Sequence, residues 1–281
     1  MCSRAVEAAI RLAQRLGVRR VEPVILHVSQ HVSVRLFPLN VVARAVSLHD
    51  QEAMRRLSRE IDIARHLVKS AAPIVGPAVE LPPGPHVQDG FAFSLWEFVE
   101  HVAADDENAG HVTGAAEALH RLHQALATFP GELPDFRSKV DHCGRLLESE
   151  AALPALRVND RDFLLGAFDR LRASLAGLRA EAVPIHGDTH LRNVFITADG
   201  ARWNDLEDVC LGSREWDISS FPEADLGMFE PINRDLLTTL GYLRGLCAVV
   251  WCSEKYDVPE KRDAAEYHLR YLRGLGLFRG V

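Results

Sequence analysis

Two polar segments in the second half of the chain carry the side chains best suited to chemistry. Residues 186–193 read H-G-D-T-H-L-R-N, and residues 204–208 read N-D-L-E-D. A carboxylate followed by an amide and then by a second carboxylate is the layout of a phosphoryl-transfer site. Such a site needs one group to orient and deprotonate a hydroxyl, and oxygen ligands for the Mg²⁺ that neutralises nucleotide phosphates. Asp188 suits the first role, and Asn193 and Asp205 suit the second.

These motifs also carry a family resemblance. The pattern H-G-D-x-x-x-x-N resembles the catalytic loop of the aminoglycoside phosphotransferase and choline kinase superfamily, a group of small-molecule kinases. Residues 212–218 resemble its G-x-x-x-x-D-[LI] element, and the resemblance extends over roughly residues 20–225. It implies that Asp217 supports the catalytic loop and that His186 is structural, bonding within that loop.

Each of these residues also has a plainer interpretation. Asp188 could be a turn residue that caps local amides, and Asp217 could be the N-cap of a helix that starts at Ile218. Asn193 could simply begin a strand, and Asp205 could be a surface carboxylate. A carboxylate within the apolar run from Trp203 to Val209 is costly unless it is paired, and a metal ion would pair with it.

A different metal chemistry is open to the same segment. His186, Asp188 and His190 alternate along the chain, so an extended strand could present all three to zinc, as in a metallohydrolase. Such a site needs further ligands from distant positions, and the chain holds 13 histidines. The zinc interpretation leaves the spacing of Asn193, Asp205 and Asp217 as coincidence.

Composition limits the other classes of protein. The apolar fraction of 47% is normal for a globular chain of 281 residues, and the net charge of −7 argues against a nucleic-acid partner. The five cysteines form no C-x-x-C pair, which favours reduced thiols. The N-terminus has no signal-peptide pattern, and the apolar run at 246–251 is too short for a membrane span. We therefore expect a cytoplasmic protein without a membrane partner, and the oligomeric state stays open.

Hydrophobic periodicity predicts a sheet-rich first part. A helix at 5–16 precedes strands at 21–28, 32–37 and 40–46, and a helix at 51–70 precedes a strand at 91–99. This order matches the small lobe of a kinase-like fold. We expect an α+β, bilobal protein-kinase-like fold with an antiparallel-sheet N-terminal nucleotide-binding lobe at 1–96 and a mostly helical C-terminal lobe at 97–281.

The later part of the chain reads as helical. A helix is expected at 115–129, another is capped by Asn159, and helices resume at 231. Two short strands at 193–197 and 202–206, joined by a turn at 198–200, interrupt this pattern at the catalytic segment.

The resemblance extends to nucleotide binding. Residues 41–44, V-V-A-R, resemble the kinase V-A-I-K strand with Arg44 in the lysine position. A cation there reaches the phosphates and pairs with a helix glutamate, for which Glu60 is the candidate. The loop at 29–33 has no glycine to let backbone amides approach phosphate closely, so Ser29 and Ser33 could supply hydroxyls instead, as the resemblance implies.

The segment from Leu95 to Glu100 fits the hinge between lobes, whose backbone groups would bond adenine. The residues expected to form the base-binding slot are Glu97, Phe98, Val99, Ala43, Phe195 and Asn204.

Together these features predict Mg²⁺-dependent transfer of a phosphate from ATP or GTP to a hydroxyl of a small molecule, with an antibiotic such as an aminoglycoside as one candidate acceptor. Glu223, Asp225 and Glu230 could receive a polyamine, or could form an ordinary solvated surface. A pseudokinase that only binds a ligand is the alternative, because the nucleotide loop lacks glycine.

Overall fold

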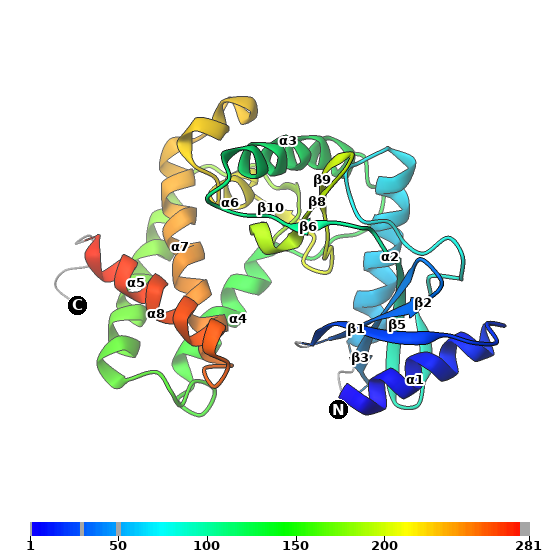
Figure 1. Cartoon of the computed structure of the whole chain (residues 1–281). Helices are drawn as coiled ribbons and strands as arrows, with labels where there is room; N and C mark the ends of the chain where they lie inside the picture. The colour runs from blue at the N-terminus through cyan, green and yellow to red at the C-terminus, as the bar shows by residue number, and fades with distance from the viewer. Residues whose placement is uncertain (1, 29–30, 49–51, 276–281) are drawn as a thin grey trace. The chain divides into compact units, whose positions relative to one another are not determined.

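The computed structural model describes residues 2–28, 31–48 and 52–275 (Figure 1). The chain forms two compact units: Met1–Gly131 with His190–Val209, and Glu132–Thr189 with Cys210–Val281. The segment at 186–193 is therefore divided, because Asp188 belongs to the second unit and Asn193 to the first. The expected lobes at 1–96 and 97–281 stay a prediction, because the first unit combines the N-terminal sheet with later segments.

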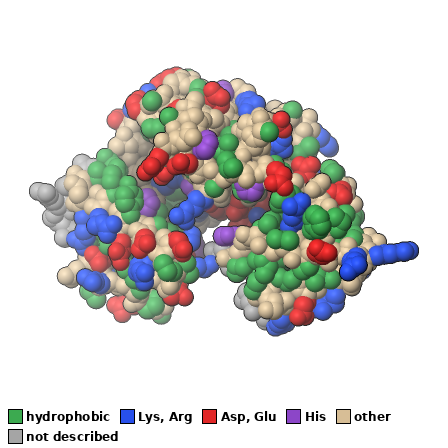
Figure 2. All heavy atoms as spheres, viewed as in Figure 1, with side chains coloured by type: hydrophobic (Ala, Val, Ile, Leu, Met, Phe, Trp, Pro, Cys, Tyr) green, Lys and Arg blue, Asp and Glu red, His purple; other side chains and the backbone are tan. Residues whose placement is uncertain are grey.

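Acidic and basic side chains are interspersed over the face that Figure 2 shows, and no extended basic surface is visible on that face. A nucleic-acid-binding protein usually gathers its Lys and Arg on one surface. The visible face therefore gives no support to a nucleic-acid partner.

A five-stranded antiparallel sheet in the order β1-β2-β3-β5-β4 forms the centre of the first unit. Arg44 lies opposite Ser33 on one neighbouring strand and Ser94 on the other. The strands are β1 (Glu22–Val28), β2 (Val32–Phe37), β3 (Val41–Ser47), β4 (His86–Gln88) and β5 (Phe91–Glu97). Since side chains alternate along a strand, Ala43 and Arg44 point to opposite faces of this sheet.

Helices cover both faces of the sheet. α1 (Cys2–Arg15) buries its alanine-rich stripe and Leu12 against the face that carries Ala43, and Gly17 ends it in the left-handed region at φ 95°. α2 (Ala53–Lys69) packs Leu57 on the other face, which carries Arg44. The α2 helix therefore brings Glu60 to the same side as Arg44.

A second, three-stranded sheet in the first unit contains the hairpin that follows Asn193. β8 (Val194–Thr197) and β9 (Gly200–Trp203) pair with each other, and β6 (Val102–Ala103) pairs with β8. A single 3₁₀ turn, η1 (Leu191–Asn193), leads into β8. The indole Nε1 of Trp203 donates to the Ala115 carbonyl at 3.1 Å, which fixes the hairpin to α3 (Ala109–Leu126).

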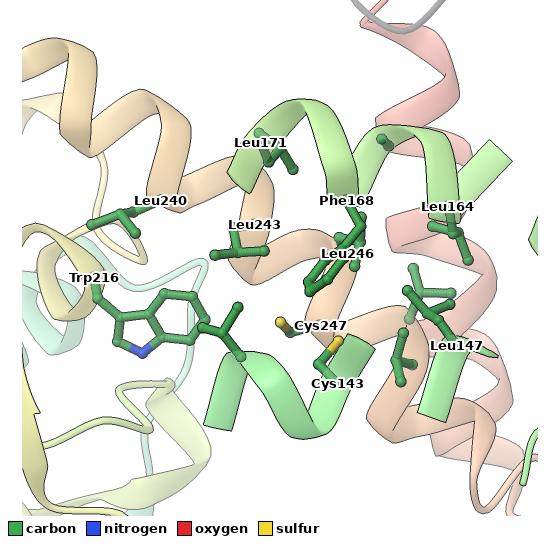
Figure 3. Close-up of a cluster of buried hydrophobic side chains, with 14 of the residues drawn as sticks. Cys143, Leu147, Leu164, Phe168, Leu171, Trp216, Leu240, Leu243, Leu246 and Cys247 are labelled. Atoms are coloured by element: carbon green, nitrogen blue, oxygen red, sulfur yellow. The ribbon is translucent and has the colours of Figure 1, made fainter. Parts of the chain in front are cut away.

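The second unit is a helical core around two short strands. Its elements are α4 (Phe136–Glu148), α5 (Val158–Gly177), β7 (Val183–Ile185), β10 (Cys210–Gly212), α6 (Arg214–Ile218), the 3₁₀ helix η2 (Glu223–Phe229), α7 (Arg234–Ser253) and α8 (Pro259–Gly274). Figure 3 shows Phe168 and Leu246 close to the sulfur atoms of Cys143 and Cys247, with Trp216 at another side of the same core. The core therefore ties α4, α5 and α7 to the short helix α6.

By length and composition, α7 is the one helix among the described residues that could cross a membrane. The sequence analysis considered only the run at 246–251, whereas the helix has 20 residues. Half of its apolar window is buried, and Leu243, Leu246 and Cys247 lie in the core of the second unit. Packing inside the protein accounts for its apolar composition.

The predicted fold class is confirmed: the N-terminal region is an antiparallel sheet and the later part is mostly helical, as in the kinase-like fold. Some details differ from the predictions. Asn159 is not the N-cap of α5, because Arg157 occupies that position. The sequence analysis missed α4, whose buried stripe includes Phe136, Val140 and Leu147 and which Asp135 caps.

Candidate active site

The loop at 186–189 in the second unit is organised by the fully buried side chain of Asp217. One carboxylate oxygen accepts the N–H of His186 at 2.7 Å, and the other accepts the N–H of Gly187 at 2.9 Å. Two charge-assisted bonds to backbone amides are strong and fix the loop in one position. Asp217 lies inside α6 and is not a helix N-cap, so the plainer interpretation of this residue is wrong.

Gly187 gives the loop its sharp change of direction. Its φ of 83° lies in the left-handed region, which glycine adopts without strain. Its carbonyl accepts the indole Nε1 of Trp216 at 3.0 Å and Nζ of Lys139 at 3.0 Å. Next along the chain, the N–H of Asp188 donates to Nδ1 of His186 at 3.3 Å. His186 thus bonds within the loop, which is the kind of contact that the resemblance implies.

Thr189 completes the loop. Its hydroxyl donates to the Asp217 carbonyl at 2.7 Å, and Arg244 of α7 donates to both its hydroxyl, at 3.0 Å, and its carbonyl. The backbone on both sides of Asp188 is therefore held, while the residue itself is only half-buried. A carboxylate on a rigid, partly exposed loop is well placed to orient a hydroxyl.

In the first unit, Arg44 gathers three carboxylates. Its guanidinium pairs with Glu60, reaches Asp205 at 3.1 Å and lies 4.0 Å from Glu207. Although burial opposes the charge, these acids raise the pKa of Arg44 above its usual range. The pairing of Arg44 with Glu60 is the one that the sequence analysis expected.

Glu60 also links α2 to the segment after β9. Only 1% of this residue is exposed, and it accepts the N–H of Leu206 at 3.1 Å. Burial raises the pKa of Glu60 to about 8, although Arg44 opposes the shift. Burial, followed by repulsion from Asp205, raises the pKa of Glu207 to about 7. The carboxylates are thus crowded, and a bound cation would relieve their repulsion.

The two expected magnesium ligands lie at the same end of the hairpin. Val194 pairs with Trp203, and the N–H of Asn204 donates to the Asn193 carbonyl at 2.8 Å, so Asn193 and Asp205 lie near each other in the first unit. Asp205 adopts a left-handed φ of 61°, which aspartate tolerates better than most residues. An amide oxygen and a carboxylate fit Mg²⁺, which takes one or two protein ligands together with water and phosphate oxygens.

The zinc interpretation finds no support. Within residues 2–28, 31–48 and 52–275, no group of three or more His, Cys, Asp or Glu side chains could hold a metal ion. His186 is fully buried and its Nδ1 accepts the N–H of Asp188, whereas His190 is exposed. The alternation of these residues in sequence reflects a turn around Gly187, not an extended strand.

Two backbone amides that were expected to bond adenine have acceptors within the protein. The N–H of Glu97 donates to the Gly76 carbonyl and the N–H of Phe98 to the Asn40 carbonyl, both at 2.9 Å. The Val99 carbonyl lies 2.7 Å from Nδ1 of His101. The amides of Glu97 and Phe98 are therefore engaged within the protein and are not free to bond a base.

The other residues expected to form the base-binding slot do not all lie on one surface. Ala43 is fully buried against α1, on the face of the sheet opposite to Arg44. Because side chains alternate along the strand, Val42 is the neighbour that shares the face of Arg44. Phe195 is half-buried and stacks on His101 at a centroid distance of 3.7 Å. Asn204 is also half-buried and adjoins Asn193. Ser29 lies outside the described residues.

Sequence analysis missed Lys139 and Arg244 as partners of the loop. They lie 48 and 55 positions from the residues they contact, and neither belongs to a motif. It did single out Glu223 and Glu230 as possible polyamine ligands. Each of these two carboxylates pairs with Arg234 at 2.5 Å, so the cluster already contains a cation.

The fold and this site define a kinase-like phosphotransferase. A family model described as "Phosphotransferase enzyme family" matches residues 40–246, and the chain belongs to that family. A search of curated proteins found no match.

Solved structures of small-molecule kinases share the fold. A choline/ethanolamine kinase family protein from Mesorhizobium loti is 16% identical, with 98% of this chain and 94% of that chain covered and a TM-score of 0.68. APH(2″)-IIIa in its GDP and kanamycin complex is 15% identical, with 96% and 98% covered and a TM-score of 0.73. The choline kinase LicA from Streptococcus pneumoniae is 16% identical, with 94% and 96% covered and a TM-score of 0.67.

Proposed function

We propose that this protein transfers the γ-phosphate of ATP or GTP, with Mg²⁺, to a hydroxyl of a small molecule. Membership of the phosphotransferase family supports the reaction class. The observation that carries the proposal is the loop in which buried Asp217 fixes the backbone of His186 and Gly187 while Asp188 stays half-exposed. A loop built in this way costs little reorganisation when the substrate hydroxyl arrives.

Asp188 is the residue to which we assign proton transfer. It orients the substrate hydroxyl and accepts its proton as the hydroxyl oxygen attacks phosphorus. His186 and Asp217 are structural supports, because their bonds are made within the loop. General acid–base groups of this kind contribute about 10²- to 10⁴-fold to the rate.

Asn193 and Asp205 would hold Mg²⁺, which neutralises phosphate charge when it is bound. Arg44 is assigned to the nucleotide phosphates, because its planar guanidinium can bind two phosphate oxygens at once. Glu60 holds Arg44 in place from α2 and also fixes the backbone at Leu206. Ser29, the 97–99 segment, Phe195 and Asn204 remain candidates for nucleotide contacts.

The acceptor class is open among small hydroxyl compounds. The fold is shared with kinases crystallised with kanamycin and with spectinomycin, and with choline kinases. An aminoglycoside is one candidate, although the pairing of Glu223 and Glu230 with Arg234 reduces the negative charge available to a polyamine. Because the reaction consumes nucleoside triphosphate, we assign it to the cytoplasm.

The test is phosphate transfer from labelled ATP and GTP to a panel of aminoglycosides, other antibiotics, choline, sugars and hydroxy amino acids. Asp188→Ala serves as the blank. Transfer that requires both Mg²⁺ and Asp188 supports the proposal and names the acceptor class. Nucleotide binding without transfer to any acceptor would favour a ligand-binding pseudokinase, and the absence of nucleotide binding would overturn the proposal.

A further inference from the structure

Two cationic side chains hold the backbone on either side of Asp188. Nζ of Lys139, from α4, donates to the Gly187 carbonyl at 3.0 Å. Arg244, from α7, donates to the Thr189 carbonyl, to the Thr189 hydroxyl at 3.0 Å and to the Trp216 carbonyl at 3.2 Å. The residues before and after Asp188 are therefore each bound by a cation from a different helix.

Both cations are half-buried and lie beside an aromatic ring. The Lys139 ammonium lies 4.9 Å from the ring of Trp251, and the Arg244 guanidinium lies 5.5 Å from the ring of Trp216. Burial lowers the pKa of Arg244, while the carboxylates of Asp188 and Asp217 act in the opposite direction. A cation that donates to a backbone carbonyl and lies beside an aromatic ring is held in one position more firmly than a fully solvated one.

The helices that carry the two cations are themselves joined in the core. Cys143 lies one turn after Lys139 on α4, and Cys247 lies one turn after Arg244 on α7. Figure 3 shows their sulfur atoms facing each other in the buried core, which also contains Leu147 and Leu246. Close packing of this kind fixes the positions of α4 and α7, and with them the origins of both cationic side chains.

We propose that Lys139 and Arg244 are positioning residues for Asp188, which hold the Gly187–Thr189 backbone so that its carboxylate meets the substrate hydroxyl in one geometry. This inference rests on the proposed function, in which Asp188 accepts the proton. Neither cation needs to touch the substrate. A displacement of about 1 Å at a reacting group can lower the rate about 100-fold, so the loss of a backbone clamp should be measurable.

The experiment compares charge removal with charge retention at both positions. Lys139→Met and Arg244→Met remove the cations while keeping a long apolar side chain. Lys139→Arg and Arg244→Lys retain them. Arg145→Met is the matched control, because Arg145 is an exposed cation on the same helix as Lys139. For each variant we would measure kcat, KM for the nucleotide, and amide hydrogen exchange of residues 186–189 in the full chain.

We expect kcat to fall about 10-fold in Lys139→Met and about 100-fold in Arg244→Met, while KM for the nucleotide changes less than about 2-fold. Lys139→Arg should recover most of the loss. Arg244→Lys should recover less, because an ammonium lacks the fork that reaches several oxygens. Hydrogen exchange at residues 186–189 should be faster in both Met variants, and Arg145→Met should match the wild type.

The pH dependence supplies a second readout. Both Met variants remove a positive charge near Asp188, so the acid limb of the kcat profile should move to higher pH. The other titratable groups of the loop, His186, His190 and Asp217, are the same in all variants. His268, whose pKa Arg244 lowers, is affected by Arg244→Met and not by Lys139→Met, so a shift common to both Met variants is assigned to Asp188. A purely structural loss would lower kcat without moving that limb.

Unchanged kcat together with unchanged loop exchange in both Met variants would overturn the inference and leave the proposed function intact. If the wild type transfers phosphate to no acceptor, the proposed function fails, and hydrogen exchange still decides whether the two cations hold the loop. If Arg244→Met does not fold, Arg244→Lys and the Lys139 variants decide the outcome.

Discussion

The two units hold their carboxylates in different ways. In the second unit, the carboxylate of Asp217 is fully buried and bonds to two backbone amides, so one charge fixes a loop. In the first unit, Glu60, Asp205 and Glu207 surround the single guanidinium of Arg44 through side-chain contacts. One buried charge therefore holds backbone amides in the second unit, whereas the acids of the first unit share side-chain partners, which also include His31 for Glu207. The contrast is between a carboxylate that fixes the backbone and a charge network formed by side chains.

The sharpest way to test this contrast is Asp188→Asn. The amide keeps the size of the side chain but cannot accept the proton, so we expect kcat to fall about 10³-fold. The nucleotide Kd should change little, because the proposed nucleotide contacts lie in the first unit. Steady-state kinetics and a nucleotide-binding titration measure the two effects separately. Wild-type turnover in this variant would remove Asp188 from the mechanism.

Asp217→Ala tests whether the buried carboxylate of the second unit holds the loop at 186–189. The substitution leaves the N–H groups of His186 and Gly187 buried without their acceptor, so we expect a loss of about 3 kcal/mol in the free energy of unfolding. Urea unfolding monitored by tryptophan fluorescence measures it, and Asp257→Ala in the same unit is the exposed control. A loss no larger than that of the control would contradict the role of Asp217 in holding the loop.

Arg44→Lys tests the side-chain charge network of the first unit. Lysine keeps the charge but cannot bind Glu60, Asp205 and two phosphate oxygens through a planar fork, so nucleotide affinity should fall about 10-fold. The melting temperature should fall less than in Asp217→Ala, because a cation still faces the acids. Calorimetric titration with Mg²⁺ and nucleotide gives the affinity. Affinity equal to the wild type would mean that Arg44 serves only the ion network.

His268→Gln gives the smallest expected effect and concerns pH. Burial, followed by repulsion from Arg244, lowers the pKa of His268 below its ordinary value. The neutral imidazole therefore stabilises the fold above about pH 6.5, and this contribution is lost as pH falls through the lowered pKa, because the unfolded chain binds the proton more readily. Urea unfolding at pH 7.5 and 5.5 should show a smaller acid loss in the variant. An equal loss in both proteins would assign the acid sensitivity to other groups.

Local sequence patterns were sufficient to predict several secondary-structure elements and one contact. β2 was predicted at the bounds that the structure has, because its apolar residues alternate and Pro38 follows it. The pairing of Arg44 with Glu60 was also anticipated, because the resemblance implies a cation on this strand that pairs with a glutamate on the following helix. In contrast, α4 was missed: its stripe is short, and its burial depends on contacts with α5 and α7 that no local pattern reports.

Misplaced predictions share one physical cause. Ala43 was assigned to the nucleotide slot by its closeness to Arg44 in sequence, but alternation along β3 puts it on the opposite face against α1. The amides of Glu97 and Phe98 were expected to face adenine, yet carbonyls of Gly76 and Asn40 accept them. In both cases a residue's neighbours in space, and not its neighbours in sequence, decide which groups are left for a ligand.

The sequence by itself determined the family and predicted the site, because residues 186–193 and 204–208 hold two carboxylates and an amide at the spacing typical of that family. The tertiary structure decided how those groups are held. Lys139 and Arg244 reach the loop from helices 48 and 55 positions away, and Asp217 bonds it from 30 positions away. Such contacts depend on how the helices pack, because only the folded core brings groups so distant in the chain within hydrogen-bonding distance.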